Sequence, residues 1–160
     1  MLNCQILCVG KLKERFFTEA SKEYEKRLSR YIRLSIIEVS DEKAPPNLSA
    51  AQIEQVKEAE GERLIARLPQ DAHAVALALD GKTFSSPAWS NWFSGHMNQG
   101  VSKLAFIIGG SNGLSEAVLK RCKERVSFSE FTFSHQLMRI ILLEQIYRSM
   151  KIMSGESYHK

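Results

Sequence analysis

Cysteine and proline are scarce in this chain, which has only three cysteines and four prolines among its 160 residues. Cys4, Cys8 and Cys122 are too widely scattered for a disulfide framework, and they fit reduced, packed thiols. No pair of cysteines or histidines has the spacing typical of zinc ligands, so no metal is expected. This cysteine usage predicts a cytoplasmic protein.

Long apolar runs are absent too. No segment approaches the length that would cross a bilayer, so no membrane partner is expected. The short apolar run at residues 2–9 precedes its charges, which predicts a first strand and excludes a signal peptide. The excess of basic residues is mild, 22 against 18 acidic ones. Such a surface suits nucleic acid or phosphate without requiring either.

Strand and helix patterns alternate along the chain. This alternation predicts an α/β fold, with a mainly parallel sheet flanked by helices on both faces, in a single domain over residues 1–160. Ser49 and Gln52 form a capping box, Ser86 and Pro87 read as an N-cap and first helical residue, and Asp80-Gly81 closes the third strand. The pattern predicts strands over 2–9, 34–39, 74–79, 104–108 and 126–129, and helices over 13–32, 49–68, 86–98, 115–125 and 135–153.

The most informative segment is Leu104 to Leu114, LAFIIGGSNGL, an apolar strand that runs into a glycine-rich turn. The turn lacks the Lys-Ser/Thr pair of a phosphate loop and the acidic residue of a dinucleotide fingerprint. It is one of three loops, at 77–86, 109–113 and 128–133, that each follow a predicted strand. Loops at the carboxyl ends of neighbouring parallel strands converge, so one ligand pocket is expected there.

Six segments together resemble a known family, and the resemblance covers essentially the whole chain. They are ILCVGKLKE, VSDEKAPPN, ALDGKTFSS, FIIGGSNGL, SFSEFTFSHQLMRIILLEQIYRSMKI and the closing YHK. The chain resembles the SPOUT-class RNA methyltransferases, and among them the RlmH family, which methylates N3 of a pseudouridine in 23S ribosomal RNA.

The resemblance implies a C-terminal trefoil knot (the α/β knot), a bent S-adenosylmethionine as cofactor, and a homodimer. It places Tyr158, His159 and Lys160 beside the target base. His159 would accept a proton there, and Lys160 would stabilise negative charge. By motif match, the cofactor-binding residues would be Leu77, Gly109, Phe128, Ser129, Glu130, Phe131, Thr132 and Phe133.

Two residues depart from the family pattern. Ser134 stands where the family commonly has proline, which is expected to loosen the backbone after the cofactor loop without removing a functional group. Lys160 stands where the family often ends in arginine, and lysine lacks the bidentate fork. His135 is either an N-cap or a base contact, with the cap favoured.

Other side chains leave alternatives open. Arg139 and Arg148 suit phosphate contact or dimer pairing, whereas His73 and His96 are expected at surface positions. The last helix is apolar around most of its circumference, which favours a dimer interface over a central core helix. The first helix is expected to pack through Phe16, Phe17, Ala20, Tyr24, Leu28 and Tyr31.

The basic residues in and around the first long helix are diluted by glutamates, so their charge is modest for holding free RNA. The RNA is therefore expected within an assembled ribosomal particle. Two other functions remain: a noncatalytic RNA-binding module of the same fold, and a small-molecule methyltransferase. The basic residues are Lys11, Lys13, Arg15, Lys22, Lys26, Arg27, Arg30 and Arg33.

Overall fold

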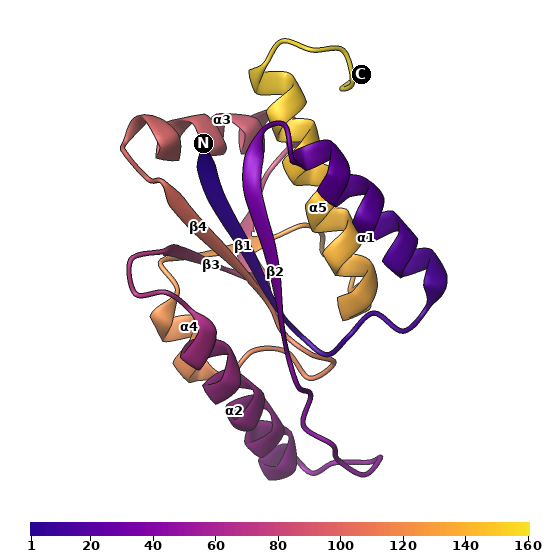
Figure 1. Cartoon of the computed structure of the whole chain (residues 1–160). Coiled ribbons are helices and arrows are strands. Elements are labelled where there is room, and N and C mark those ends of the chain that lie inside the picture. The colour runs from indigo at the N-terminus through magenta and orange to yellow at the C-terminus, as the bar shows by residue number, and fades with distance from the viewer.

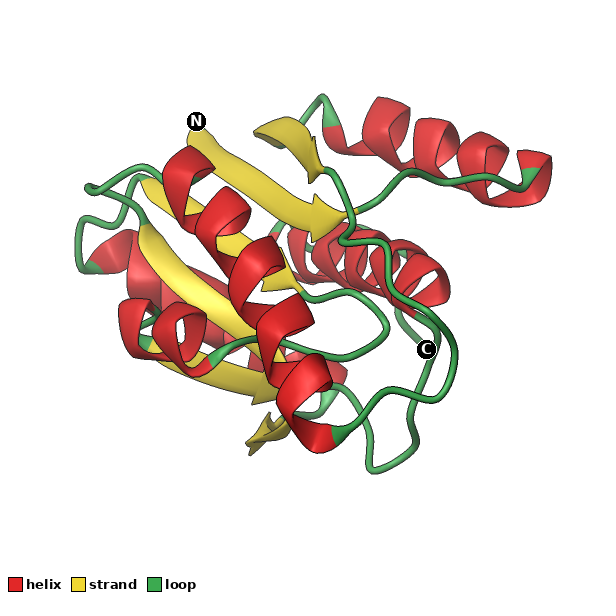
Figure 2. Cartoon of the chain, turned by 90° about the horizontal axis from the view of Figure 1, so that it is seen from below, coloured by secondary structure: helices red, strands yellow, loops and turns green.

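The computed structural model describes all residues from Met1 to Lys160. Five parallel strands form one sheet in the order β2-β1-β4-β3-β5, and helices cover both faces (Figures 1 and 2). The predicted α/β class is therefore confirmed. The elements are β1 (Leu2–Val9), α1 (Arg15–Leu28), β2 (Ile32–Val39), α2 (Ala50–Arg67), β3 (His73–Thr83), α3 (Ser86–Asn98), β4 (Lys103–Ile108), α4 (Glu116–Arg121), β5 (Glu124–Ser127) and α5 (His135–Met153).

The sheet is buried on both faces because its central strands alternate between two apolar layers. Along β4, Leu104 and Phe106 join the core under α1, α3 and α5, whereas Ala105 and Ile107 face the core under α2 and α4. Figure 1 shows these two helical layers on opposite sides of the strands. Continuous apolar strands of this kind are typical of parallel sheets, as the sequence predicted.

The beginnings of α2 and α3 are set by serine caps, one as predicted and one shifted. Ser49 caps α2 and exchanges hydrogen bonds with Gln52, so the predicted capping box is confirmed. The cap of α3 is Ser85, one residue earlier than expected. The hydroxyl of Ser86 instead donates to the side-chain oxygen of Gln145 on α5.

The first helix is shorter than the predicted span of 13–32. It ends at Leu28, and β2 already begins at Ile32 because Arg33 pairs with Asn3 of β1 in the ladder. Phe16 was expected to pack but is 64% exposed. The fourth helix likewise ends at Arg121, before its predicted end at residue 125.

The third strand does not stop at Asp80-Gly81 as predicted. β3 continues to Thr83 and pairs with β5 on both sides of a register shift between Leu77 and Lys82. The backbones are so close here that a Cβ on Gly81 would lie 2.6 Å from the backbone of Val126. Glycine is therefore required by this close approach.

The last helix has the predicted bounds, but other elements of the same chain already cover most of its apolar surface. It packs against α1 and α3, and Leu142, Leu143 and Ile146 are fully buried. The core alternative thus accounts for most of its apolar surface. No helix of the structure combines the length and the apolar character needed to span a membrane.

Arg139 on α5 is buried within its own chain. Its side chain is 2% exposed, and its guanidinium donates to Glu38 at 2.6 Å and to the carbonyl of Gly10 at 3.1 Å. Both alternatives from the sequence, phosphate contact and dimer pairing, are therefore wrong for Arg139. It joins the first turns of α5 to the carboxyl ends of β1 and β2.

The two side chains of this ion pair differ in burial. Replacing one or the other should therefore lower the free energy of unfolding by different amounts. Glu38→Gln leaves a buried guanidinium without a counter-charge and should lower the free energy of unfolding by about 3 kcal/mol. Arg139→Met leaves a carboxylate that is one-third exposed, and should cost about 1 kcal/mol. Urea unfolding measures both, with the exposed Arg15→Met as a near-neutral control. An equal or reversed order would contradict the prediction.

Candidate functional site

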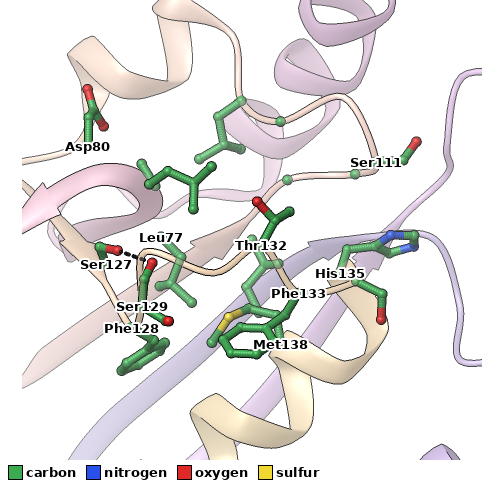
Figure 3. Close-up of a pocket in the computed structure, with 18 of the residues that line it drawn as sticks. Leu77, Asp80, Ser111, Ser127, Phe128, Ser129, Thr132, Phe133, His135 and Met138 are labelled. Atoms are coloured by element: carbon green, nitrogen blue, oxygen red, sulfur yellow. Dashed lines mark hydrogen bonds between the residues drawn. The ribbon is translucent and has the colours of Figure 1, made fainter. Parts of the chain in front are cut away.

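A cavity of about 830 Å³ lies at the carboxyl ends of β3, β4 and β5. Its volume falls in the range of small-molecule sites. Three segments form its walls: residues 77–80, the turn after β4, and the loop from β5 into α5. The sequence expected three loops to meet at this edge. The loops after β4 and β5 do meet there, whereas residues 77–80, expected in the first loop, belong to β3 itself (Figure 3).

Most of the predicted cofactor residues line this cavity. Leu77, Gly109, Phe128, Ser129, Phe131, Thr132 and Phe133 are all part of its wall. Glu130 is the exception, because it is exposed and lies outside the lining. Asp80 and Met138, which the sequence did not predict as site residues, also line it; Asp80 already accepts a hydrogen bond from Arg125 at 2.8 Å.

The glycine turn is tight enough to exclude larger residues. A Cβ on Gly109 would lie 2.7 Å from the backbone carbon of Gly113, which itself has a φ of +90°. The amide of Gly113 donates to the carbonyl of Gly110 at 3.0 Å and closes the turn. The turn thus presents backbone to the cavity with no side chain in the way.

The loop after β5 is held by its own serines. Ser127 donates to the carbonyl of Ser129 at 3.0 Å, and the hydroxyl of Ser129 accepts from the amide of Phe131 at 2.9 Å. Phe128 stacks on Trp89 of α3, with ring centroids 4.5 Å apart. Phe131 is 79% exposed, leaving an aromatic ring at the mouth of the cavity.

Ser134 caps the helix that follows. Its hydroxyl accepts from the amide of Leu137 at 3.2 Å, so Ser134 supplies the cap that was assigned to His135. The expected loosening at this position is offset by that bond. His135 begins the helix and lines the cavity, and burial together with the nearby charge of Arg139 lowers its pKa.

A smaller polar cavity of about 160 Å³ adjoins the first one and shares the turn at residues 110–112 with it. Lys11 and Lys13, which follow β1, contribute two positive charges to its wall, and Asp41 and Glu42 contribute two carboxylates. Glu60 of α2 lies there with its side chain buried, and burial raises the pKa of this carboxyl. The edge therefore combines an apolar cavity with a charged one.

The C-terminal tail lies elsewhere in the same chain. Tyr158, His159 and Lys160 do not line either cavity. The hydroxyl of Tyr158 donates to Glu144 at 3.1 Å, and Arg148 donates to Nδ1 of His159 at 3.2 Å. Burial, with hydrogen bonding to Tyr24, raises the pKa of Tyr158, so this phenol stays protonated.

Arg148, for which the sequence left phosphate contact and dimer pairing open, makes contacts within its own chain. Its guanidinium donates twice to Glu144, at 2.6 and 3.1 Å, as well as to His159. Glu144 and Arg148, which hold the tail, lie nine and thirteen residues beyond His135, which corresponds to about 14 and 20 Å along a helix. In one chain, the tail is thus held further along α5 than the part of the helix that lines the cavity.

Two histidines were misplaced by the sequence interpretation. His73 and His96, expected at the surface, have side chains that are only 16% and 17% exposed, and both contact Glu124. The three residues come from separate elements, so no local spacing could reveal them. They lie at the amino ends of β3 and β5, away from the cavity.

The arrangement at the carboxyl edge suits a flat, uncharged ring held between apolar side chains and backbone groups. Asp80 is the one carboxylate of the larger cavity, and it is already paired. The neighbouring polar cavity carries charges of both signs, from Lys11 and Lys13 and from Asp41 and Glu42. The site therefore has the features of a nucleoside-like ligand pocket beside a rim of mixed charge.

Comparison with known proteins identifies relatives over the whole chain. A family model described as "Predicted SPOUT methyltransferase" matches residues 2–159. Proteins named "Ribosomal RNA large subunit methyltransferase H" are similar to it over 99% of this chain and all of their own length: 53% identical in Listeria monocytogenes serotype 4b and 51% in Listeria welshimeri.

A solved structure shares the fold. "The structure of a probable methylase family protein from Haemophilus influenzae Rd KW20" superposes with a TM-score of 0.54 at 10% identity, covering 98% of this chain and 70% of that one. The family match spans almost every residue, from the first strand to the tail. This chain therefore belongs to the SPOUT methyltransferase family.

Proposed function

We propose that this chain is an S-adenosylmethionine-dependent methyltransferase that modifies N3 of a pseudouridine in 23S ribosomal RNA in the cytoplasm. The cavity at the ends of β3, β4 and β5 supports this most strongly, because it lies where the family resemblance puts the methyl donor. The names of the Listeria relatives favour ribosomal RNA as the substrate. The trefoil knot remains a prediction from the resemblance.

The lining of the cavity fits the donor. Leu77, Phe133 and Met138 offer apolar contacts for an adenine ring and a thioether, and the turn at Gly109 admits close approach without a Cβ. When bound, S-adenosylmethionine supplies an electrophilic methyl group on sulfur. The loops act by alignment, which contributes about 7–11 kcal/mol to lowering the barrier of such a transfer.

The acceptor must lose the proton on its ring nitrogen. We assign His159 as the base that accepts it, on the motif resemblance; for this role its Nδ1 must first be released from the hydrogen bond that it accepts from Arg148 at 3.2 Å. Lys160 would stabilise negative charge on the ring, and Tyr158 would lie beside the target base. The new bond forms between N3 and the methyl carbon as the carbon–sulfur bond breaks.

A single chain cannot bring these groups together in this arrangement. The tail is fixed to α5 by Glu144 and Arg148, about 14 and 20 Å along the helix from His135, and none of its three residues lines the cavity. We therefore infer a homodimer in which the tail of one copy completes the cavity of the other. The half-buried Ile141 and the exposed Leu137 on α5 supply apolar surface for such contact.

The RNA would approach on the side of Lys11 and Lys13. Lys11 and Lys13 are exposed beside the polar cavity, whereas Arg15 and Arg27 on α1 are paired with Glu19 and Glu23. The net charge of the chain is only +4, which favours RNA presented in an assembled ribosomal particle.

Ribosomes from a strain lacking the gene should be methylated by the purified protein and labelled donor. Mass spectrometry should map the label to N3 of one pseudouridine, with little transfer to a short free oligonucleotide. Donor binding without transfer would instead indicate a noncatalytic RNA-binding module. Transfer in the absence of RNA would indicate a small-molecule methyltransferase.

Gly109→Ala should weaken binding of S-adenosylmethionine at least about tenfold, because the added methyl meets the backbone of Gly113 and distorts the turn. Calorimetry measures the affinity. Gly95→Ala is the matched control, since a Cβ there meets nothing within 4 Å. Equal affinities in the two variants, both folded by circular dichroism, would contradict the assigned cofactor site.

Catalysis across subunits can be tested by mixing two inactive variants. Gly109→Ala impairs the donor site and His159→Ala the tail, so each alone should lose most single-turnover methylation. Coexpressed in equal amounts, half of the dimers are mixed and hold one intact composite site, which should restore about a quarter of the wild-type rate. If no activity returns in mixed dimers, or if His159→Ala alone is fully active, the arrangement is wrong.

A further inference from the structure

At the amino edge of the sheet, opposite the cavity, three side chains meet. His73 begins β3, Glu124 begins β5, and His96 lies near the end of α3, just before β4 begins. Nε2 of His73 is 2.5 Å and Nε2 of His96 is 2.9 Å from the same oxygen of Glu124. The possible ligand atoms of all three residues lie within 4.8 Å of one another. The methyl-transfer site uses none of these residues.

The ring of His96 has an acceptor at each nitrogen. Its Nδ1 is 2.9 Å from the carbonyl oxygen of Trp92, and its Nε2 faces the carboxylate of Glu124. A neutral imidazole carries a single N–H and can satisfy only one of these acceptors. The other contact therefore requires a cation between ring and acceptor, which is either a second proton or a metal ion.

The surroundings favour a metal ion. Nδ1 of a metal-bound histidine commonly donates to a backbone carbonyl, as the contact between His96 and Trp92 would allow. The indole of Trp92 donates to the second oxygen of Glu124 at 2.9 Å and so fixes the carboxylate. No lysine or arginine pairs with Glu124, so its charge remains available to a cation.

We propose that His73, His96 and Glu124 form a site for a divalent transition metal ion, with Zn²⁺ the best match. Two imidazole nitrogens and one carboxylate oxygen are a ligand set that zinc accepts, with a water in the fourth position. Bonds of about 2.0–2.1 Å to zinc separate neighbouring ligand atoms by about 3.3 Å. The two rings would need to move outward by less than about 1 Å.

Such an ion would act on the fold and not on the methyl transfer. It would join β3, α3 and the edge strand β5, which the ladder holds on one side only. Because metal bound to the folded state stabilises it by mass action, zinc should raise the unfolding temperature.

Calorimetry with zinc chloride on the metal-stripped protein tests the site. The wild-type chain should bind one equivalent, and its unfolding temperature should rise. His96→Gln should weaken binding at least about a hundredfold, and Trp92→Phe, which removes only the support of Glu124, by about tenfold to a hundredfold. Cys122→Ser is the control for binding at the partly exposed thiol and should leave the affinity unchanged.

A second readout reports on the ligands directly. Co²⁺ bound at the site should give visible d–d absorption that is lost in His96→Gln and kept in Cys122→Ser. The proposal is overturned if the wild-type chain binds no zinc, which would leave a proton as the shared cation. It is also overturned if His96→Gln binds as tightly as the wild type, or if Cys122→Ser abolishes binding. None of these readouts depends on the proposed RNA activity.

Discussion

The buried guanidinium of Arg139 fixes the geometry on which the carboxyl edge depends. It holds the beginning of α5 to Glu38 and to the carbonyl of Gly10, where β2 and β1 end. The first residue of α5, His135, lines the cavity. The ion pair between Arg139 and Glu38 therefore also positions this part of the cavity wall. A charged side chain in such a place is tolerated only because its partners are supplied by two other elements.

Much of this edge could be predicted from sequence, because the deciding signals are local. The unbroken apolar run of β4 and the glycine turn after it identify a buried parallel strand and a ligand-binding turn. The turn needs glycine at Gly109 because of a close backbone approach. The motif resemblance added the loop from Phe128 to Phe133, all of which except Glu130 lines the cavity.

What the sequence could not predict depends on distant partners. The extension of β3 past Asp80-Gly81 exists because β5 lies beside it, and the position of β5 is set 45 residues further along the chain. The burial of Arg139 depends in the same way on Glu38. His73 and His96 seemed to be surface residues because nothing near them in the chain indicates Glu124. Ser134 was compared with the proline that the family commonly has at this position. Its hydroxyl nevertheless caps α5, because it accepts a hydrogen bond from the amide of Leu137.

The short edge strand β5 runs from the histidine cluster at the amino edge of the sheet to the cavity at the carboxyl edge. It has four residues, and it pairs with β3 alone, so the ladder by itself determines its position weakly. Its first residue, Glu124, is held by His73, His96 and Trp92, and its last, Ser127, hydrogen-bonds into the loop that lines the cavity. Because so short a strand moves as a unit, contacts that fix Glu124 also restrict the loop that begins after Ser127. The amino-edge cluster therefore contributes to the order of a site that it does not touch.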